Sequence, residues 1–136
     1  MIQVIAGKKG SGKTKRIIDM TNNATQEIHH DVVFIDDDNR YMFDLRHQAR
    51  FINAGEYNLT SDQMFMGFLY GVVAQNFDVG LISIDAFKKL IKTDLPSTAW
   101  LFERLEDIST KHSVNFLLSV SEDPDELPDF IKQYVI

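Results

Sequence analysis

An eight-residue stretch near the start of the chain constrains its fold more than any other feature. Residues 7–14 read Gly-Lys-Lys-Gly-Ser-Gly-Lys-Thr and match the pattern G-x-x-x-x-G-K-[ST] at every fixed position. Glycines let a backbone turn tightly and bring its N–H groups close to phosphate oxygens without Cβ clashes. The stretch therefore predicts a concave phosphate site between a strand and a helix. A plain glycine-rich turn is the alternative.

The residue types of this stretch each have an expected role. Lys13 is predicted to reach the terminal phosphates as a point charge, and the Thr14 hydroxyl is predicted to ligate Mg²⁺. The remaining predicted phosphate-site residues supply backbone N–H groups or positive charge, and they are Gly7, Lys8, Lys9, Gly10, Ser11 and Gly12. Lys8 and Lys9 are interpreted as solvated charges that attract an anionic nucleotide. Lys8 also resembles the signature lysine of the deviant-Walker ATPases, although Lys9 stands where that pattern has glycine.

The apolar pattern of the rest of the chain predicts alternating strands and helices. Strands are expected at 2–6, 32–35, 50–53, 81–84 and 114–120. Helices are expected at 13–28, at 61–76 after an N-cap at Thr60, from about 94–97 through 111, and after Asp123 and Pro124. Residues 37–49 permit no assignment. Right-handed crossovers then give a three-layer α/β/α sandwich with a mostly parallel five-stranded sheet, and residues 1–136 form one domain.

The composition excludes several classes of protein. The 136 residues include no Cys, which removes disulfides, thiolate zinc sites and cysteine nucleophiles. The 14 Lys and Arg against 20 Asp and Glu give a net charge of −6, which argues against a general nucleic-acid-binding surface. No apolar run is long enough to span a membrane, and the first residues lack the features of a signal peptide. We expect a cytoplasmic protein. The four His residues show no metal or triad spacing.

A second acid is expected near Thr14, because Mg²⁺ needs further oxygen donors. Two apolar runs end in Asp, one at Asp85 and one at Asp36. We favour Asp85, because in the P-loop class with an inserted strand the metal-facing Asp lies several elements downstream of the phosphate loop. Asp36 remains the alternative. Ala86 follows Asp85 where many ATPases have Glu.

Three further groups are candidates for handling the terminal phosphate. Asp36 and Asp38 could orient an attacking water, and a solvated acidic loop is the competing interpretation. Ser119, near the end of the last predicted strand, is the sensor candidate. Arginine fingers could come from Arg46, Arg50 and Arg104, for which surface or structural ion pairs are the favoured interpretation.

The phosphate loop, the 36–38 acids and the Asp85 strand together resemble P-loop NTPases of the additional-strand, RecA-like division. The whole chain also resembles small stand-alone bacterial ATP-binding proteins that are labelled twitching-motility-protein (PilT)-like. Residues 7–14, 44–52 and 84–87 carry that second resemblance. Both resemblances imply ATP binding on a RecA-like core.

The function predicted from the sequence is Mg²⁺-dependent ATP binding by a slow ATPase or nucleotide switch. A non-hydrolysing ATP-binding regulatory module and a small-molecule kinase are the alternatives. ATP is favoured over GTP, since the guanine motif N-K-x-D is absent. A homo-oligomer is also expected, because RecA-like cores often complete their sites across an interface. No protein partner is identified.

Overall fold

The computed structural model describes all 136 residues, Met1–Ile136, and its sheet has five strands. The strands are β1 (Ile2–Gly7), β2 (Asp31–Asp36), β3 (Ala49–Asn53), β4 (Val79–Ile84) and β5 (Asn115–Ser121). They lie in the order β1-β5-β4-β2-β3, and every neighbouring pair is parallel. The predicted five-stranded parallel sheet is thereby confirmed. Strand β5 separates β1 from β4, which is the inserted-strand arrangement that the sequence resemblance implied.

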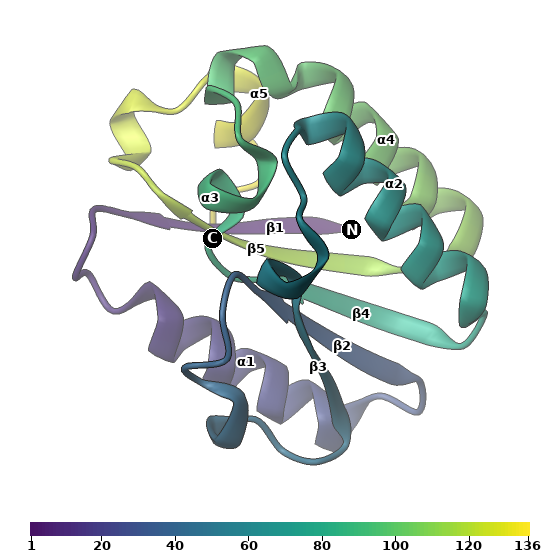
Figure 1. Cartoon of the computed structure of the whole chain (residues 1–136). Helices are drawn as coiled ribbons and strands as arrows, with labels where there is room; N and C mark the ends of the chain where they lie inside the picture. The colour runs from purple at the N-terminus through teal and green to yellow at the C-terminus, as the bar shows by residue number, and fades with distance from the viewer.

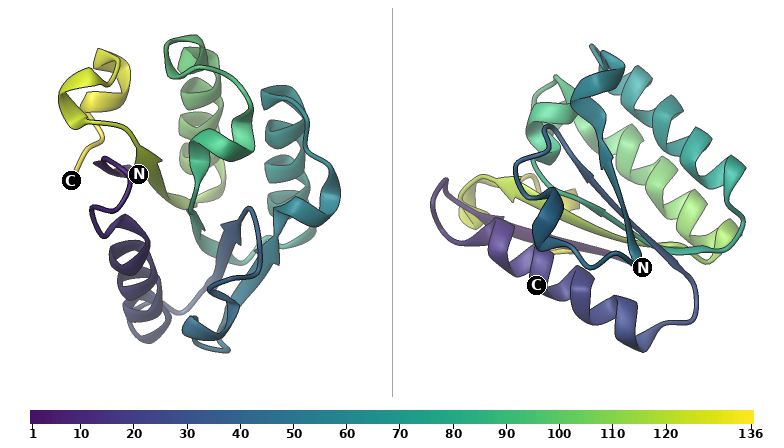
Figure 2. Two further views of the ribbon diagram at one scale, coloured as in Figure 1. Left: turned by 60° about the vertical axis from the view of Figure 1, so that its left-hand side comes forward. Right: turned by 60° about the horizontal axis from the view of Figure 1, so that its bottom comes forward.

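Helices cover both faces of this sheet. The α-helices are α1 (Lys13–Glu27), α2 (Asp62–Gln75), α3 (Phe87–Ile91), α4 (Ala99–His112) and α5 (Asp129–Lys132). Short 3₁₀ segments are η1 (Met42–Asp44), η2 (Ala54–Tyr57), η3 (Leu95–Thr98) and η4 (Pro124–Glu126). Helix α1 lies on one face of the sheet, and α2 and α4 lie on the other (Figures 1 and 2). The predicted three-layer arrangement is confirmed.

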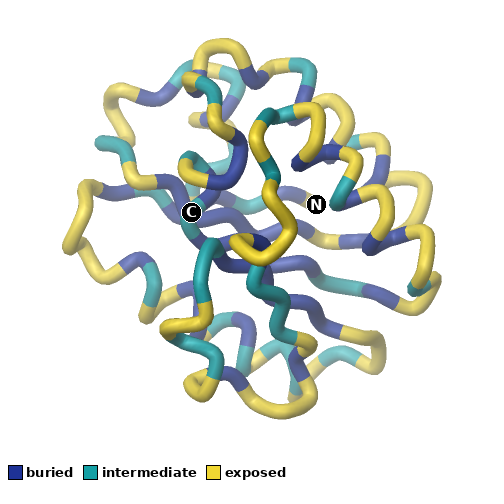
Figure 3. Tube along the Cα trace, in the orientation of Figure 1, coloured by how far each residue is buried: buried dark blue, intermediate teal, exposed yellow.

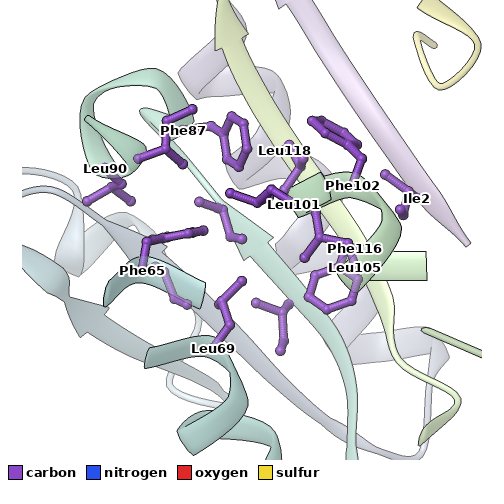
Figure 4. Packing of buried hydrophobic residues seen from close by; sticks show 14 of the residues in the cluster. Ile2, Phe65, Leu69, Phe87, Leu90, Leu101, Phe102, Leu105, Phe116 and Leu118 are labelled. Atoms are coloured by element: carbon purple, nitrogen blue, oxygen red, sulfur yellow. The ribbon is translucent and has the colours of Figure 1, made fainter. Parts of the chain in front are cut away.

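Two hydrophobic clusters, one on each face of the sheet, hold these layers together. Strand β2 is buried at five consecutive positions, which is typical of a parallel strand covered on both sides. Val33 and Ile35 belong to the larger cluster, while Val32 and Phe34 belong to the smaller cluster beneath α1. Figure 3 shows the buried strands between more exposed loops, and Figure 4 shows aromatic and aliphatic side chains packed in the larger cluster.

Some local predictions were wrong. The N-cap of α2 is Ser61, whose side chain accepts a hydrogen bond from the Met64 N–H, whereas the Thr60 hydroxyl donates to the Met64 sulfur. Helix α3 was not predicted, so the chain has five α-helices where four were expected. The helix expected from about 94–97 begins as the 3₁₀ turn η3. The unassigned 37–49 segment contains η1.

The outer edge of β1 is partly covered by the last residues of the chain. Val4 donates its N–H to the Tyr134 carbonyl at 2.9 Å and accepts from the Ile136 N–H at 3.0 Å. This segment runs parallel to β1 at Val4 and Val135. None of the helices combines the length and apolar character that crossing a bilayer requires.

Candidate functional site

The glycine-rich loop at 7–14 connects β1 directly to α1, as the sequence predicted. Gly10 and Gly12 have φ of 85° and 86°, a left-handed conformation that glycine adopts without the steric penalty of a Cβ. At Gly7 an added Cβ would lie 2.4 Å from the Ser11 Oγ, so a larger residue there would displace the Ser11 side chain. The glycines therefore let the loop turn tightly, so that its backbone N–H groups can approach an anion.

Lys13 extends across this loop. Its side chain is buried, and its Nζ donates a hydrogen bond to the Lys8 carbonyl at 3.1 Å. Burial lowers the pKa of the Lys13 ammonium, and the charge of Asp85 opposes that shift. Lys13 also lines the cleft, where a phosphate oxygen could replace the Lys8 carbonyl as the partner of its ammonium group.

Asp85, directly after β4, connects the three elements of the site. The Thr14 hydroxyl on α1 donates to its Oδ2 at 3.1 Å, and the Ser119 hydroxyl on β5 donates to its Oδ1. The Ser119 Oγ also accepts the Ala86 N–H at 3.1 Å. Asp85 is 5% exposed, and these hydrogen bonds offset the free-energy cost of burying its carboxylate.

The Thr14 and Asp85 oxygens fit a magnesium ion. Adjacent ligands of octahedral Mg²⁺ lie about 3 Å apart, because each Mg–O distance is about 2.1 Å. The two oxygens are 3.1 Å apart, and both residues line the same cleft. Asp36 makes no such contact with Thr14. The geometry therefore favours Asp85 over Asp36 as the partner of Thr14.

Asp36 ends β2 and is buried at 2% exposure. One carboxyl oxygen, Oδ1, accepts the Asp37 N–H at 2.8 Å, but Oδ2 has no hydrogen-bond partner. Such an unpaired buried polar atom typically costs about 1–3 kcal/mol. Burial, together with the nearby Asp37 and Asp85 carboxylates, raises the pKa of Asp36 to about 8. The raised pKa favours the protonated, uncharged form of this buried carboxyl group.

Asp37 and Asp38 follow at the rim of the cleft, and each pairs with a cation. The Asp38 Oδ1 accepts the Arg40 N–H at 2.9 Å, and its Oδ2 lies 3.3 Å from the Arg40 guanidinium. Asp37 lies 3.8 Å from the Lys89 ammonium. The interpretation of 36–38 as a wholly solvated loop is wrong for Asp36, which is buried.

These groups line one cleft of about 990 Å³ at the carboxyl ends of the parallel strands. The lining residues that sequence reasoning missed include Arg40, Tyr41, Lys88 and Lys89. Their positions directly after the two predicted acidic strand ends were the available signal. Side chains at such strand ends converge on one edge of a parallel sheet.

The other candidates lie outside the cleft. Arg46, Arg50 and Arg104 do not line it, and none of them forms an ion pair, so the favoured interpretation as ion-pair residues was wrong. All three are exposed on loop, edge-strand or helix surfaces. Lys8 is exposed and lies 3.7 Å from Asp123, on the outer side of the loop.

Comparison with known proteins gives a match among solved structures. No protein-family model and no curated protein matches the chain. Among solved structures, it is similar to domain III of the replication initiation protein DnaA from Thermotoga maritima, with a TM-score of 0.55 and 17% identity. The match covers 98% of this chain and 50% of that chain, so this chain spans about half the length of the DnaA structure.

The chain shares the α/β fold of that DnaA domain, with its mostly parallel five-stranded sheet between helices. At 17% identity the match bears on the fold alone. It confirms the predicted fold class but gives no support to the PilT-like label. The roles of the individual site residues stay predictions, which the geometry above makes specific.

Proposed function

We propose that the chain binds a nucleoside triphosphate together with Mg²⁺ and acts as a slow ATPase or nucleotide switch. The observation that carries this proposal is the contact between the Thr14 hydroxyl and Asp85 at the edge of a glycine loop with two left-handed residues. The buried carboxylate and the hydroxyl would be two ligands of a metal ion, and the neighbouring loop would bind the phosphates.

Each residue has a defined task in this proposal. The loop N–H groups and Lys13 bind the phosphates, while Thr14 and Asp85 would hold the ion. Bound Mg²⁺ would neutralise charge on the terminal phosphates. Ser119 is a positioning residue, since its hydroxyl is committed to Asp85 and to the Ala86 N–H.

Slow turnover follows from the acids that are present. Ala86 replaces the Glu that would follow Asp85 in many ATPases. The pKa of Asp36 is raised to about 8, which favours its protonated form, and that form is a poor acceptor for a proton from water. Asp38, which lies in the cleft and is half-exposed, is the remaining candidate for orienting water.

Calorimetry and a phosphate-release assay test the proposal. MgATP should bind the chain, and Lys13→Ala should weaken binding at least tenfold, whereas Lys111→Ala at the exposed end of α4 should leave it unchanged. Turnover should fall in Asp38→Ala. Absence of binding at millimolar MgATP would overturn the proposal, and tight binding without turnover would favour the non-hydrolysing regulatory module.

One observation favours phosphoryl transfer to a small acceptor as a second candidate function. A second cavity of about 570 Å³ shares Asp37, Lys88 and Lys89 with the first cleft. Its volume suits a metabolite, and its lysines suit an anionic one. ADP production that requires an added acceptor would support a kinase, and acceptor-independent phosphate release would support the ATPase.

The predicted PilT-like relationship and the predicted homo-oligomer stay predictions. The structural match bears only on the fold, and a single chain is described.

A further inference from the structure

We propose that Asp36, Asp37 and Asp38 form a second divalent-cation site, separate from the predicted Thr14–Asp85 pair. One ligand oxygen from each of the three carboxylates lies within 4.8 Å of the other two. Strand β2 ends at Asp36, and the chain bends over the next two residues, so consecutive side chains converge instead of alternating between faces.

The buried carboxyl oxygen of Asp36 points to a cation. Its Oδ2 is excluded from solvent and has no hydrogen-bond partner, although the residue lines the cleft. A buried carboxyl oxygen without a partner is unfavourable, whereas a divalent ion that takes the place of the carboxyl proton satisfies this oxygen and offsets the carboxylate charge. None of the hydrogen bonds within the 36–40 segment satisfies this atom.

The spacing and the ligand type define the class of ion. Ligands on opposite sides of a Ca²⁺ ion are separated by about 4.6–5.2 Å, and those of Mg²⁺ by about 4.2 Å. Three carboxylate oxygens that all lie within 4.8 Å of one another are close enough to ligate one hard divalent ion, such as Mg²⁺, Mn²⁺ or Ca²⁺, after small side-chain rotations. Because all three ligands are carboxylate oxygens, the site should prefer hard ions over soft metals.

The protein cations nearest the cluster are replaceable. Arg40 pairs with Asp38 at 3.3 Å and Lys89 pairs with Asp37 at 3.8 Å, but these two basic side chains are 67% and 69% exposed. Exposed pairs of this kind contribute little stability, so a divalent ion could displace them at small cost. Neither cation reaches the free oxygen of Asp36.

This site uses no oxygen of Thr14 or Asp85, so it should bind an ion without nucleotide. Mn²⁺ binding to the nucleotide-free chain, followed by electron paramagnetic resonance, tests it. Wild type should bind one Mn²⁺, and both Asp36→Asn and Asp38→Asn should bind at least tenfold more weakly. Thr14→Ala, which removes a ligand of the nucleotide's ion, should retain binding.

Asp44→Asn is the matched control, because Asp44 lines the same cleft and its carboxylate makes no hydrogen bond or ion pair. It should bind Mn²⁺ like wild type. No Mn²⁺ binding by folded wild type at millimolar ion, or equal loss in Thr14→Ala and Asp38→Asn, would overturn the second site. MgATP binding measured on the same samples tests the proposed function separately.

Discussion

At the scale of single residues, the site depends on how Asp85 is held. Thr14 on α1 contacts one of its carboxylate oxygens, and Ser119 on β5 contacts the other. The glycine loop and the acid proposed to face the metal are thus joined directly through the Thr14 hydroxyl. A preorganised acid of this kind needs little rearrangement when the ligand binds.

Removing the Ser119 hydroxyl should reveal its positioning role. Ser119→Ala leaves a buried Asp85 oxygen and the Ala86 N–H without their partner, which should cost about 1–3 kcal/mol in the free energy of unfolding. It should also raise the Mg²⁺ concentration needed for nucleotide binding. Urea unfolding and an Mg²⁺ titration measure both effects. Ser121→Ala, at an exposed cleft position whose side chain makes no hydrogen bond, is the control, and an equal effect there would contradict the role.

Asp36 should make the ion-free chain less stable as pH rises. Its pKa is about 8 in the folded state and about 4 when unfolded, so between these values only the folded chain holds the proton. The free energy of unfolding should then fall with rising pH by up to about 1.4 kcal/mol per unit, and level off above pH 8. Denaturant unfolding in EDTA, compared with Asp36→Asn, isolates this term. Parallel pH profiles for the two proteins would be the contrary result.

At the scale of elements, α2 is unusual for a surface helix. Its only charged residue is Asp62 in the first turn, and Gly67 and Gly71 lie on its exposed side. A Cβ added at either glycine would meet nothing within 4 Å. Neither glycine is therefore needed for packing inside this chain, although each weakens the helix.

Alanine at these two positions should stabilise the protein. Gly67→Ala and Gly71→Ala should each raise the free energy of unfolding by about 0.5–1 kcal/mol, because they lower the entropy lost on helix formation. Thermal unfolding measures the change. Gly55→Ala is the contrasting variant and should destabilise, since its Cβ would lie 2.3 Å from the Asp37 carbonyl oxygen. Destabilisation by both α2 variants would show that these glycines serve a contact within the fold.

At the scale of the whole molecule, the proposed ligand should stabilise the fold by mass action. MgATP at one hundred times its Kd should add about 2.7 kcal/mol to the free energy of unfolding. For a domain of this size, that should raise Tm by roughly 5–10 °C. A thermal scan with MgATP, and with Mg²⁺ alone, measures the shift. A shift of equal size in Lys13→Ala would mean that the ligand binds elsewhere.

The architecture could be predicted because its signals are local. Strand β2 is an uninterrupted apolar run, as expected of a strand covered on both faces, and the glycine loop has its own backbone requirements. Helix α3 escaped prediction because five residues contain too little periodicity, and it follows Ala86, which has a φ of 57°. A left-handed alanine leaves no signal in the sequence.

The site could be predicted only in part, for a physical reason. Lys13, Thr14 and Asp85 belong to spaced patterns, and the structure brings them together. The burial of Asp36 and the approach of Lys89 to Asp37 depend on tertiary packing between elements that are distant in the chain. Residues that form such contacts are not separated by a characteristic number of positions, so one sequence alone does not reveal them.

The C-terminal segment also determines how copies of this chain could assemble through their sheets. Because Val4 is already hydrogen-bonded to that segment, β3 is the border strand without a bonded neighbour along its outside. Two copies that joined through β3 about a two-fold axis would form one continuous sheet of ten strands, with a C-terminal segment at each outer edge. On the β1 side a second copy could pair with Val4 only after the C-terminal segment leaves it, so pairing between sheets is open at β3 and hindered at β1.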